Sequence, residues 1–222
     1  MTINGAPPAA GWYFYHSIFA RPSQLTNGGS NQNFIARAVM YPYTAPGSTG
    51  PANANPCYDS SPDFLEDPAL LAVTNSNIVY NNLGYDPDLD SLYYDWADPI
   101  ITFPNTPISW TAGYSSASPL PTGAGSTGAV LIGETGEVSF TSAQAGSFAT
   151  CLKVESWRCG QKIGEIFRDI PISILSQTVQ TGFCAATYQP GPPLLSLTPD
   201  NSLGTPTVLT PITNITGDTI AY

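Results

Sequence analysis

The sequence predicts an all-β protein, and three observations indicate this fold class. Only 10% of the 222 residues are charged, while proline (22), glycine (20) and tyrosine (12) are abundant, a mix that suits strands joined by turns. Residues 147–175 alternate apolar and polar side chains on either side of Cys159-Gly160, the pattern of a β-hairpin. No segment shows a sustained 3.6-residue apolar period with capping signals, so we expect very little helix.

The N-terminal part predicts two strands, at 12–15 and 34–41, on either side of a loop at 27–31. A hairpin alone is marginal in water, so this one needs further strands or packing against a neighbour. Residues 44–56 (TAPGSTGPANANP) are typical of a linker or long loop. We therefore expect the end of a preceding β unit plus linker at 1–56, a complete β-sandwich at 57–176, and the start of a following β unit at 177–222.

The central part predicts a series of strands separated by turn residues, with a long exposed loop at 112–128. These strands are expected near 62–66, 76–82, 91–97, 108–111, 128–133, 136–141, 148–157 and 163–175.

The last two of these strands form the clearest hairpin, and it holds four of the six basic residues, Lys153, Arg158, Lys162 and Arg168. Opposite charges on facing strands stabilise by roughly 0.2–1 kcal/mol a pair. A strict two-residue turn would place Val154 opposite Glu165, so we expect a bulge or a longer loop.

Four stretches of the chain carry a resemblance to a known family, and together they cover about residues 57–176. The hairpin supplies Val154-Glu155, Arg158, Lys162-Ile163-Gly164 and Arg168-Asp169-Ile170. The other three are Ser60-Ser61-Pro62-Asp63-Phe64, Asp86-Pro87-Asp88-Leu89-Asp90-Ser91-Leu92 and Glu134-Thr135-Gly136-Glu137-Val138-Ser139-Phe140. Their order and spacing resemble the extracellular repeat domains of large Bacteroidetes cell-surface proteins, including gliding-motility adhesins secreted by the type IX system.

This resemblance implies tandem Ig/cadherin-like antiparallel β-sandwiches on the bacterial cell surface. It also implies neighbouring repeat domains of the same chain as partners. Cys159 departs from the family pattern, because a polar residue such as asparagine usually stands at that turn, and the departure suggests a disulfide in this member.

The run Asp86-Pro87-Asp88-Leu89-Asp90 is the first candidate site. Calcium takes six to eight oxygen ligands, several of them carboxylates, so we expect a calcium site at Asp86, Asp88 and Asp90. Asp59 and Asp63 are close in sequence to the entry of the expected sandwich, and the loop should lie at the same pole, so they are possible further ligands. The glycine and distal glutamate of an EF-hand are missing. The alternative is a solvated acidic loop whose aspartates cap turns.

The four cysteines, Cys57, Cys151, Cys159 and Cys184, allow three pairings. Cys57 and the turn at Cys159 are expected at the same pole, which favours a Cys57–Cys159 disulfide. Cys151–Cys184 is then the second bond, and buried free thiols are the alternative. Cys-x7-Cys with one histidine does not match the close ligand pairs of a zinc site.

Composition argues against several function classes. The net charge of −10, with only six basic residues, argues against nucleic-acid binding. No run of 18 apolar residues is present, so no transmembrane helix is expected.

Catalytic patterns are weak. The single histidine, His16, lies within an aromatic strand, and nothing distinguishes Asp95 and Glu134 from surface acids. We expect no enzymatic activity.

The aromatic run Tyr93, Tyr94, Trp96, Trp110 and Tyr114 supplies core residues, and an exposed subset could stack on sugars. The expected function is thus a non-catalytic, secreted cell-adhesion segment that forms a stalk or fibre and attaches to a surface polysaccharide or similar substrate, in gliding motility by resemblance. The alternative is a carbohydrate-binding module or an accessory domain of a secreted glycosidase.

Overall fold

The structure is a computed structural model that describes residues 5–51, 59–66 and 70–177. Within these ranges the chain is all-β and has no helix, as predicted. The strands are β1 (Trp12–Phe19), β2 (Asn33–Met40), β3 (Asp63–Phe64), β4 (Leu70–Val73), β5 (Asn77–Asn81), β6 (Gly84–Tyr85), β7 (Ser91–Trp96), β8 (Ile100–Thr102), β9 (Thr106–Pro107), β10 (Thr122–Gly123), β11 (Ser126–Thr127), β12 (Val130–Leu131), β13 (Glu137–Thr141), β14 (Gly146–Arg158) and β15 (Gln161–Leu175).

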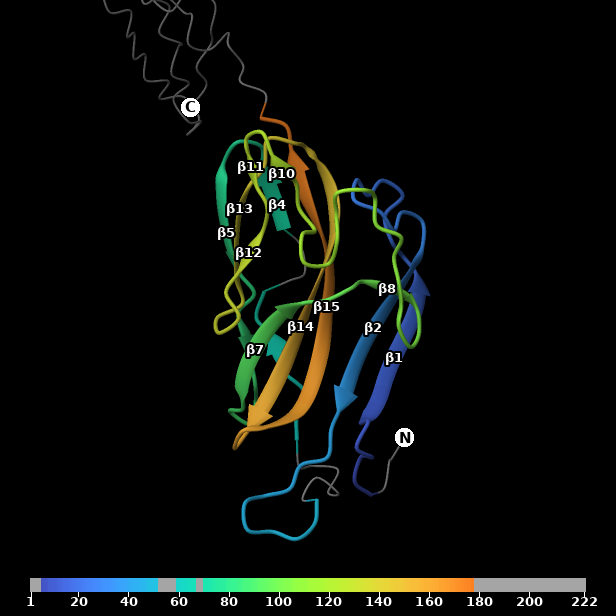
Figure 1. Cartoon of the computed structure of the whole chain (residues 1–222), viewed down its shortest axis with the longest axis vertical. Helices are drawn as coiled ribbons and strands as arrows, with labels where there is room; N and C mark the ends of the chain where they lie inside the picture. The colour runs from blue at the N-terminus through green and yellow to red at the C-terminus, as the bar shows by residue number, and fades with distance from the viewer. Residues whose placement is uncertain (1–4, 52–58, 67–69, 178–222) are drawn as a thin grey trace, which may run out of the picture. The chain divides into compact units, whose positions relative to one another are not determined.

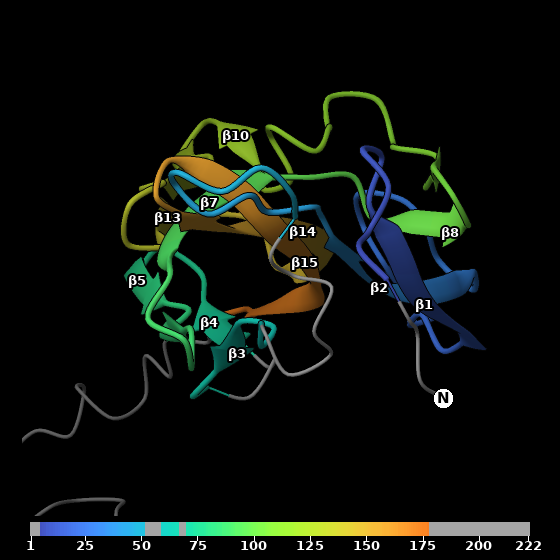
Figure 2. The same cartoon turned by 90° about the horizontal axis from the view of Figure 1, so that it is seen from below.

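Two sheets face each other. The large sheet has the order β1-β2-β15-β14-β7, with β4 pairing in parallel with the end of β15, and the smaller sheet has the order β12-β13-β5 (Figure 1). Seen from below, β1 and β2 extend the large sheet away from β13 and β5 of the smaller one (Figure 2). The shorter pairs β3-β6, β8-β9 and β10-β11 lie around this framework.

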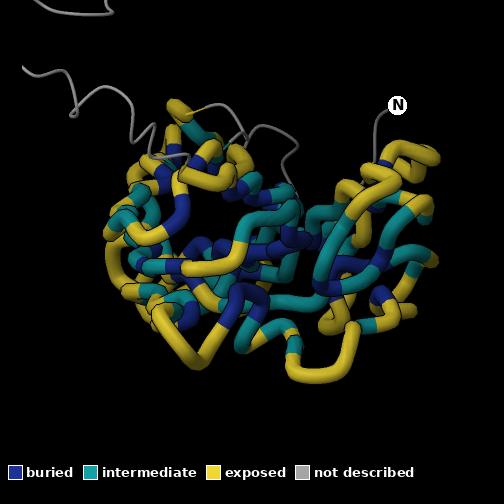
Figure 3. The backbone as a smooth tube through the Cα atoms, turned by 90° about the horizontal axis from the view of Figure 1, so that it is seen from above, coloured by how far each residue is buried: buried dark blue, intermediate teal, exposed yellow. Residues whose placement is uncertain are grey.

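The core fills the space between the sheets because every second residue of each strand points inward. β14 and β15 contribute Phe148, Leu152, Ile172 and Ile174, and β13 contributes Val138 and Phe140. Ala72 of β4 and Leu120 complete the cluster. Buried segments gather where the sheets meet (Figure 3).

The hairpin has a two-residue turn together with a bulge, the first of the two expected alternatives. Arg158 faces Gln161 across Cys159 and Gly160, and these two have φ values of 48° and 76°. Positive φ at both central residues defines the type I′ turn that matches the twist of the flanking strands. The register shifts after Ser156, so Val154 faces Ile166 instead of Glu165. The predicted bulge is therefore confirmed, and it returns the apolar faces to register.

This register places two carboxylates, Glu155 and Glu165, directly opposite each other. Lys162 resolves the repulsion, because its Nζ lies 3.3 Å from Glu155 Oε1 and 3.0 Å from Glu165 Oε2. Lys153 adds a second cation 3.0 Å from Glu155.

The structure differs from the expected division at residue 56. The hairpin β1–β2 does not belong to a separate unit, because β2 pairs with β15 from Gly164 to Ile166. The described residues belong to one compact unit that ends at Gln177, and residues 178–222, where a following β unit was expected, lie outside the described residues. The described part of the predicted linker or long loop, residues 44–51, contains no strand, and β2 before it pairs with β15 of the same unit.

Two further expectations are wrong in detail. Residues 108–111 form no strand and make only an isolated bridge between Trp110 and Gly28. The loop 112–128 contains the short pair β10-β11, and Leu120 within it is only 1% exposed. Both segments are held in place by the buried Asn27, which donates to the Pro119 carbonyl and whose own carbonyl accepts from Thr111 N.

Leu120 offers a direct test of this core. We expect Leu120→Ala to lower the free energy of unfolding by about 2–5 kcal/mol, because it removes buried methyl groups and leaves a cavity. The matched control is Leu65→Ala, since Leu65 is 73% exposed. Urea unfolding followed by circular dichroism measures both, and equal losses for the two variants would contradict the placement of residue 120 in the core.

Candidate functional site

The acidic loop lies at the end of the unit that carries the Cys159-Gly160 turn, here called the turn pole. β7 runs antiparallel to β14 and starts with Ser91 opposite Trp157, so residues 86–90 reach this pole directly before β7. Residue 59 lies beside them, and the topology thus brings together carboxylates that are distant in sequence, as the sequence argument expected.

Arg158 is the centre of this site. Its Nε donates to Asp90 Oδ1 at 2.7 Å and its Nη2 donates to Asp90 Oδ2 at 2.5 Å. The same Nη2 also donates to Asp59 Oδ1 at 3.0 Å. Asp88 is further away, at 4.0 Å, and its Oδ2 accepts a hydrogen bond from Ser60 N. The two-pronged contact with Asp90 is the strongest kind of arginine–carboxylate pair.

Asp86 shapes the loop from inside. Its Oδ1 accepts hydrogen bonds from the backbone amides of Asp88 at 2.9 Å and of Asp90 at 3.4 Å, which closes an Asx turn. The residue is 5% exposed, and its Oδ2 has no hydrogen-bond partner among the described residues. Burial raises the pKa of Asp86, although the two backbone amides favour its charged form.

The predicted ligands are only partly brought together. Asp86, Asp88, Asp90 and Asp59 lie around the turn pole, whereas Asp63 lies on β3, where it accepts from Phe64 N and Tyr85 Oη. Both oxygens of Asp90 are taken by Arg158. Over the described ranges, no group of three or more histidine, cysteine or acidic side chains is arranged to hold a metal ion. Calcium binding through Asp90 would compete with Arg158 for the same oxygens, and calcium binding stays a prediction.

Sequence reasoning had assigned Arg158 to the hairpin alone and missed its role in the acidic loop. A signal was present, because the chain has only six basic residues for 16 acidic ones, but the pairing spans 68 residues from Asp90 to Arg158.

Two of the four cysteines, Cys151 and Cys159, fall in the described residues, and they form no disulfide with each other. Cys151 is buried in the middle of β14, and burial raises the pKa of its thiol well above the ordinary value, so the thiol stays protonated. Cys159 is exposed at the turn. The expected partners Cys57 and Cys184 lie outside the described residues, so the two pairings stay predictions.

The aromatic run divides as strand alternation requires. Tyr94 is 3% exposed in the core, while Tyr93 is 46% exposed on the other face of β7. Trp110 donates from Nε1 to Asp98 Oδ1 at 3.0 Å, and Tyr114 packs on Phe148.

The residues considered for catalysis lie on three different segments of the chain. His16 is exposed on β1, and Asp95 lies 3.7 Å from Lys153 Nζ. Glu134 lies in an exposed turn.

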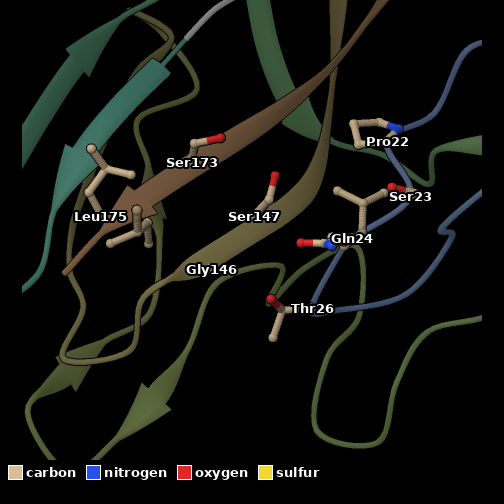
Figure 4. A pocket seen from close by; sticks show the side chains of 10 residues that line it. Pro22, Ser23, Gln24, Thr26, Gly146, Ser147, Ser173 and Leu175 are labelled. Atoms are coloured by element: carbon tan, nitrogen blue, oxygen red, sulfur yellow. The ribbon is translucent and has the colours of Figure 1, made fainter.

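Two pockets lie between β14–β15 and the segment after β1. One, of about 600 Å³, is lined by uncharged groups, among them Gln24, Ser147 and Ser173 (Figure 4). None of its lining side chains ionises, so they supply no general acid or base. The other, of about 380 Å³, has apolar walls including Ile18 and Phe34, and it contacts the buried ion pair between Arg21 and Asp169.

Comparison of this chain with protein-family models, with curated proteins and with solved structures found no match. In the described part of the chain, no helix is long and apolar enough to span a membrane.

The calcium prediction can be tested through stability. If the loop carboxylates bind the ion, stability rises with free calcium because only the folded state holds the site. We expect millimolar calcium, but not sodium of equal ionic strength, to raise the melting temperature, and Asp88→Asn to reduce the rise. Arg158→Gln should enlarge it by freeing Asp90. An unchanged melting temperature in both the wild type and Arg158→Gln would return the loop to the solvated alternative.

Asp59 gives the turn pole a pH dependence. Burial raises its pKa from 3.8 to about 6, against the opposing effect of Arg158. Because the folded value is above the unfolded one, Asp59 favours folding most below its ordinary pKa, and this contribution is lost as pH rises through about 6. We therefore expect the melting temperature of Asp59→Asn to rise relative to wild type between pH 4 and pH 7.

Differential scanning calorimetry across this range measures the effect, with Glu134→Gln as the control for loss of a surface carboxylate. A constant difference between wild type and Asp59→Asn at all pH values would contradict the burial of the Asp59 carboxyl.

Proposed function

We propose that this chain is a non-catalytic segment of an extracellular adhesin, built from Ig/cadherin-like β-sandwiches in tandem, that forms a stalk or fibre on the bacterial surface. The proposal combines the motif resemblance with the direction of the chain through the unit. Its partners would be neighbouring repeat domains of the same chain and an adhesion substrate such as a surface polysaccharide.

The observation that carries the proposal is that the chain enters and leaves the unit at opposite ends. β1 is antiparallel to β2, and β2 is antiparallel to β15, so β1 and β15 run in the same direction. β1 starts at the turn pole and β15 ends at the opposite pole (Figure 1). At about 3.3 Å a residue, the 15 residues of β15 span roughly 50 Å. Units connected in this way extend end to end, as a stalk requires.

The Arg158 network supports the same proposal. It joins the turn of the β14–β15 hairpin to residue 59 and to the 86–90 loop, all at the pole where the chain enters. Ion pairs that link several segments stiffen that end against bending, which is where a preceding domain would be attached.

A carbohydrate-binding module is the second candidate, and exposed aromatic rings favour it. Tyr93 on β7 is 46% exposed, and Trp157 on β14, which pairs with the first residue of β7, is 36% exposed. Aromatic faces stack on sugar rings. An adhesin segment can use the same rings, so sugar binding by itself would not exclude the stalk.

The test uses antibodies raised against the 222-residue chain. We expect them to label intact, unpermeabilised cells that produce the protein, and their monovalent fragments to reduce attachment of those cells to glass and agarose. Labelling only after permeabilisation would overturn the proposal. In parallel, retardation of the purified chain in gels containing soluble polysaccharide, lost in a Tyr93→Ala/Trp157→Ala variant but kept in Tyr85→Ala, would favour the carbohydrate-binding module for this surface.

A further inference from the structure

The strand β1 is a free edge of the large sheet. It pairs with β2 along its whole length, from Trp12 opposite Met40 to Phe19 opposite Asn33, without a register shift. Over the described ranges it has no second strand partner, and it lies on the side of β2 away from β15 (Figures 1 and 2). One row of its backbone amides and carbonyls is therefore available for a further strand.

This edge has none of the usual protection against pairing. Natural edge strands are short, bulged, or carry lysine or proline. β1 has eight residues, WYFYHSIF, without a bulge, a proline or a lysine, and seven of the eight are exposed. The exposed set includes large apolar side chains, among them Phe14 at 43%, Ile18 at 49% and Phe19 at 70%.

The strand is also held in place before any partner arrives. Tyr15 stacks on Phe103, with ring centroids 4.1 Å apart and planes 5° from parallel, and Tyr13 contacts the same ring edge-on at 5.7 Å. These contacts fix the face of β1 that points toward the β8–β9 hairpin. A partner strand would therefore meet a formed edge and would not have to order it, which lowers the entropic cost of pairing.

Charge indicates the partner. All 16 acidic residues of the chain lie at position 59 or later, and none occurs in residues 1–58. The two arginines of that segment interact within the unit. Arg21 forms an ion pair with the buried Asp169, and Arg37 Cζ lies 3.6 Å from the ring centroid of Phe167. The strand β1 thus carries no acidic or basic side chain except His16. Nearby carboxylates such as Asp59 and Glu165 line a pocket with Phe14, so the edge suits a neutral strand better than an acidic peptide or nucleic acid.

A second copy of this chain fits that requirement. Two molecules of net charge −10 repel each other, and they do so least where both present a segment without carboxylates. We propose that β1 pairs antiparallel with β1 of a second copy, about a twofold axis, so that the two large sheets become one continuous sheet. The pairing stands on the strand edge alone and does not depend on the proposed function.

Geometry restricts the register of this pair. Residues that face each other across antiparallel strands lie on the same face of the sheet, and side chains alternate between faces. In a twofold pair of identical strands, the facing positions must therefore be both even or both odd. The axis then passes midway between one residue and its own copy, and maximal overlap of Trp12–Phe19 makes this residue Tyr15 or His16. The central residue faces its own copy.

The first experiment measures association of the 222-residue chain by sedimentation velocity at concentrations from micromolar to several hundred micromolar. We expect a concentration-dependent monomer–dimer equilibrium, abolished by Phe14→Lys and by Ile18→Lys, because a charged edge opposes strand pairing. Val79→Lys is the control, since Val79 of β5 is 57% exposed on the other sheet. A wild-type chain that stays monomeric, or a dimer unaffected by both lysine variants, would overturn the proposal.

The second experiment tests the register by cysteine cross-linking, in a background with Cys57, Cys159 and Cys184 replaced by serine and its fold verified by circular dichroism. The central position brings two Cα atoms to about 4.5–5.5 Å, within disulfide range. We expect Tyr15→Cys or His16→Cys to form a covalent dimer on mild oxidation. Tyr13→Cys should not, because its copies would stand at least four residues apart along the strands. Equal cross-linking at all three positions, or none at any, would refute antiparallel β1 pairing.

Discussion

The β14–β15 hairpin is the constraint on which the rest of the described fold depends. β7 pairs with one of its strands, β2 and β4 pair with the other, and β1 is attached through β2. Its inward side chains also supply half of the buried core cluster. Because the turn at Cys159 and Gly160 fixes the hairpin register, it also fixes which residues of all these strands face the core. A shift of one residue in the pairing of this hairpin would move its core-facing side chains to the opposite face of the sheet.

The few cations of the chain fasten distant segments to this hairpin. Arg168 of β15 donates to the Glu66 and Asn82 carbonyls and lies 4.1 Å from the ring of Phe64. Arg21 reaches Asp169 of β15, and Arg37 stacks on Phe167 of the same strand. With Arg158 at the turn pole, all four arginines connect the hairpin to segments outside it. In a chain with 16 acids and six basic residues, the scarce positive charge is thus used for architecture, and the surface is left acidic.

The sequence predicted what depends on local pattern. Alternation identified the hairpin, Cys159-Gly160 identified its turn, and the mismatch of Val154 with Glu165 identified the bulge. It could not show that β2 pairs with β15, because Met40 and Gly164 are 124 positions apart and neither carries a periodic signal of that pairing. Trp110 looked like a strand residue because aromatic and β-branched residues surround it, yet Asn27 holds this segment as a loop. At the acidic loop, the sequence identified the carboxylates, but only the tertiary structure shows that Arg158 is their cationic partner.

The parallel course of β1 and β15 has a mechanical consequence. If the unit is stretched between its two ends, the force acts along the strands. It pulls the start of β1 toward the turn pole and the end of β15 toward the opposite pole. The ladders between β1 and β2 and between β2 and β15 are then loaded in shear, so that all their hydrogen bonds share the force at once. A hairpin pulled open from one end would instead lose its bonds one after another. A molecule arranged in this way resists tension best along the axis on which neighbouring units would pull.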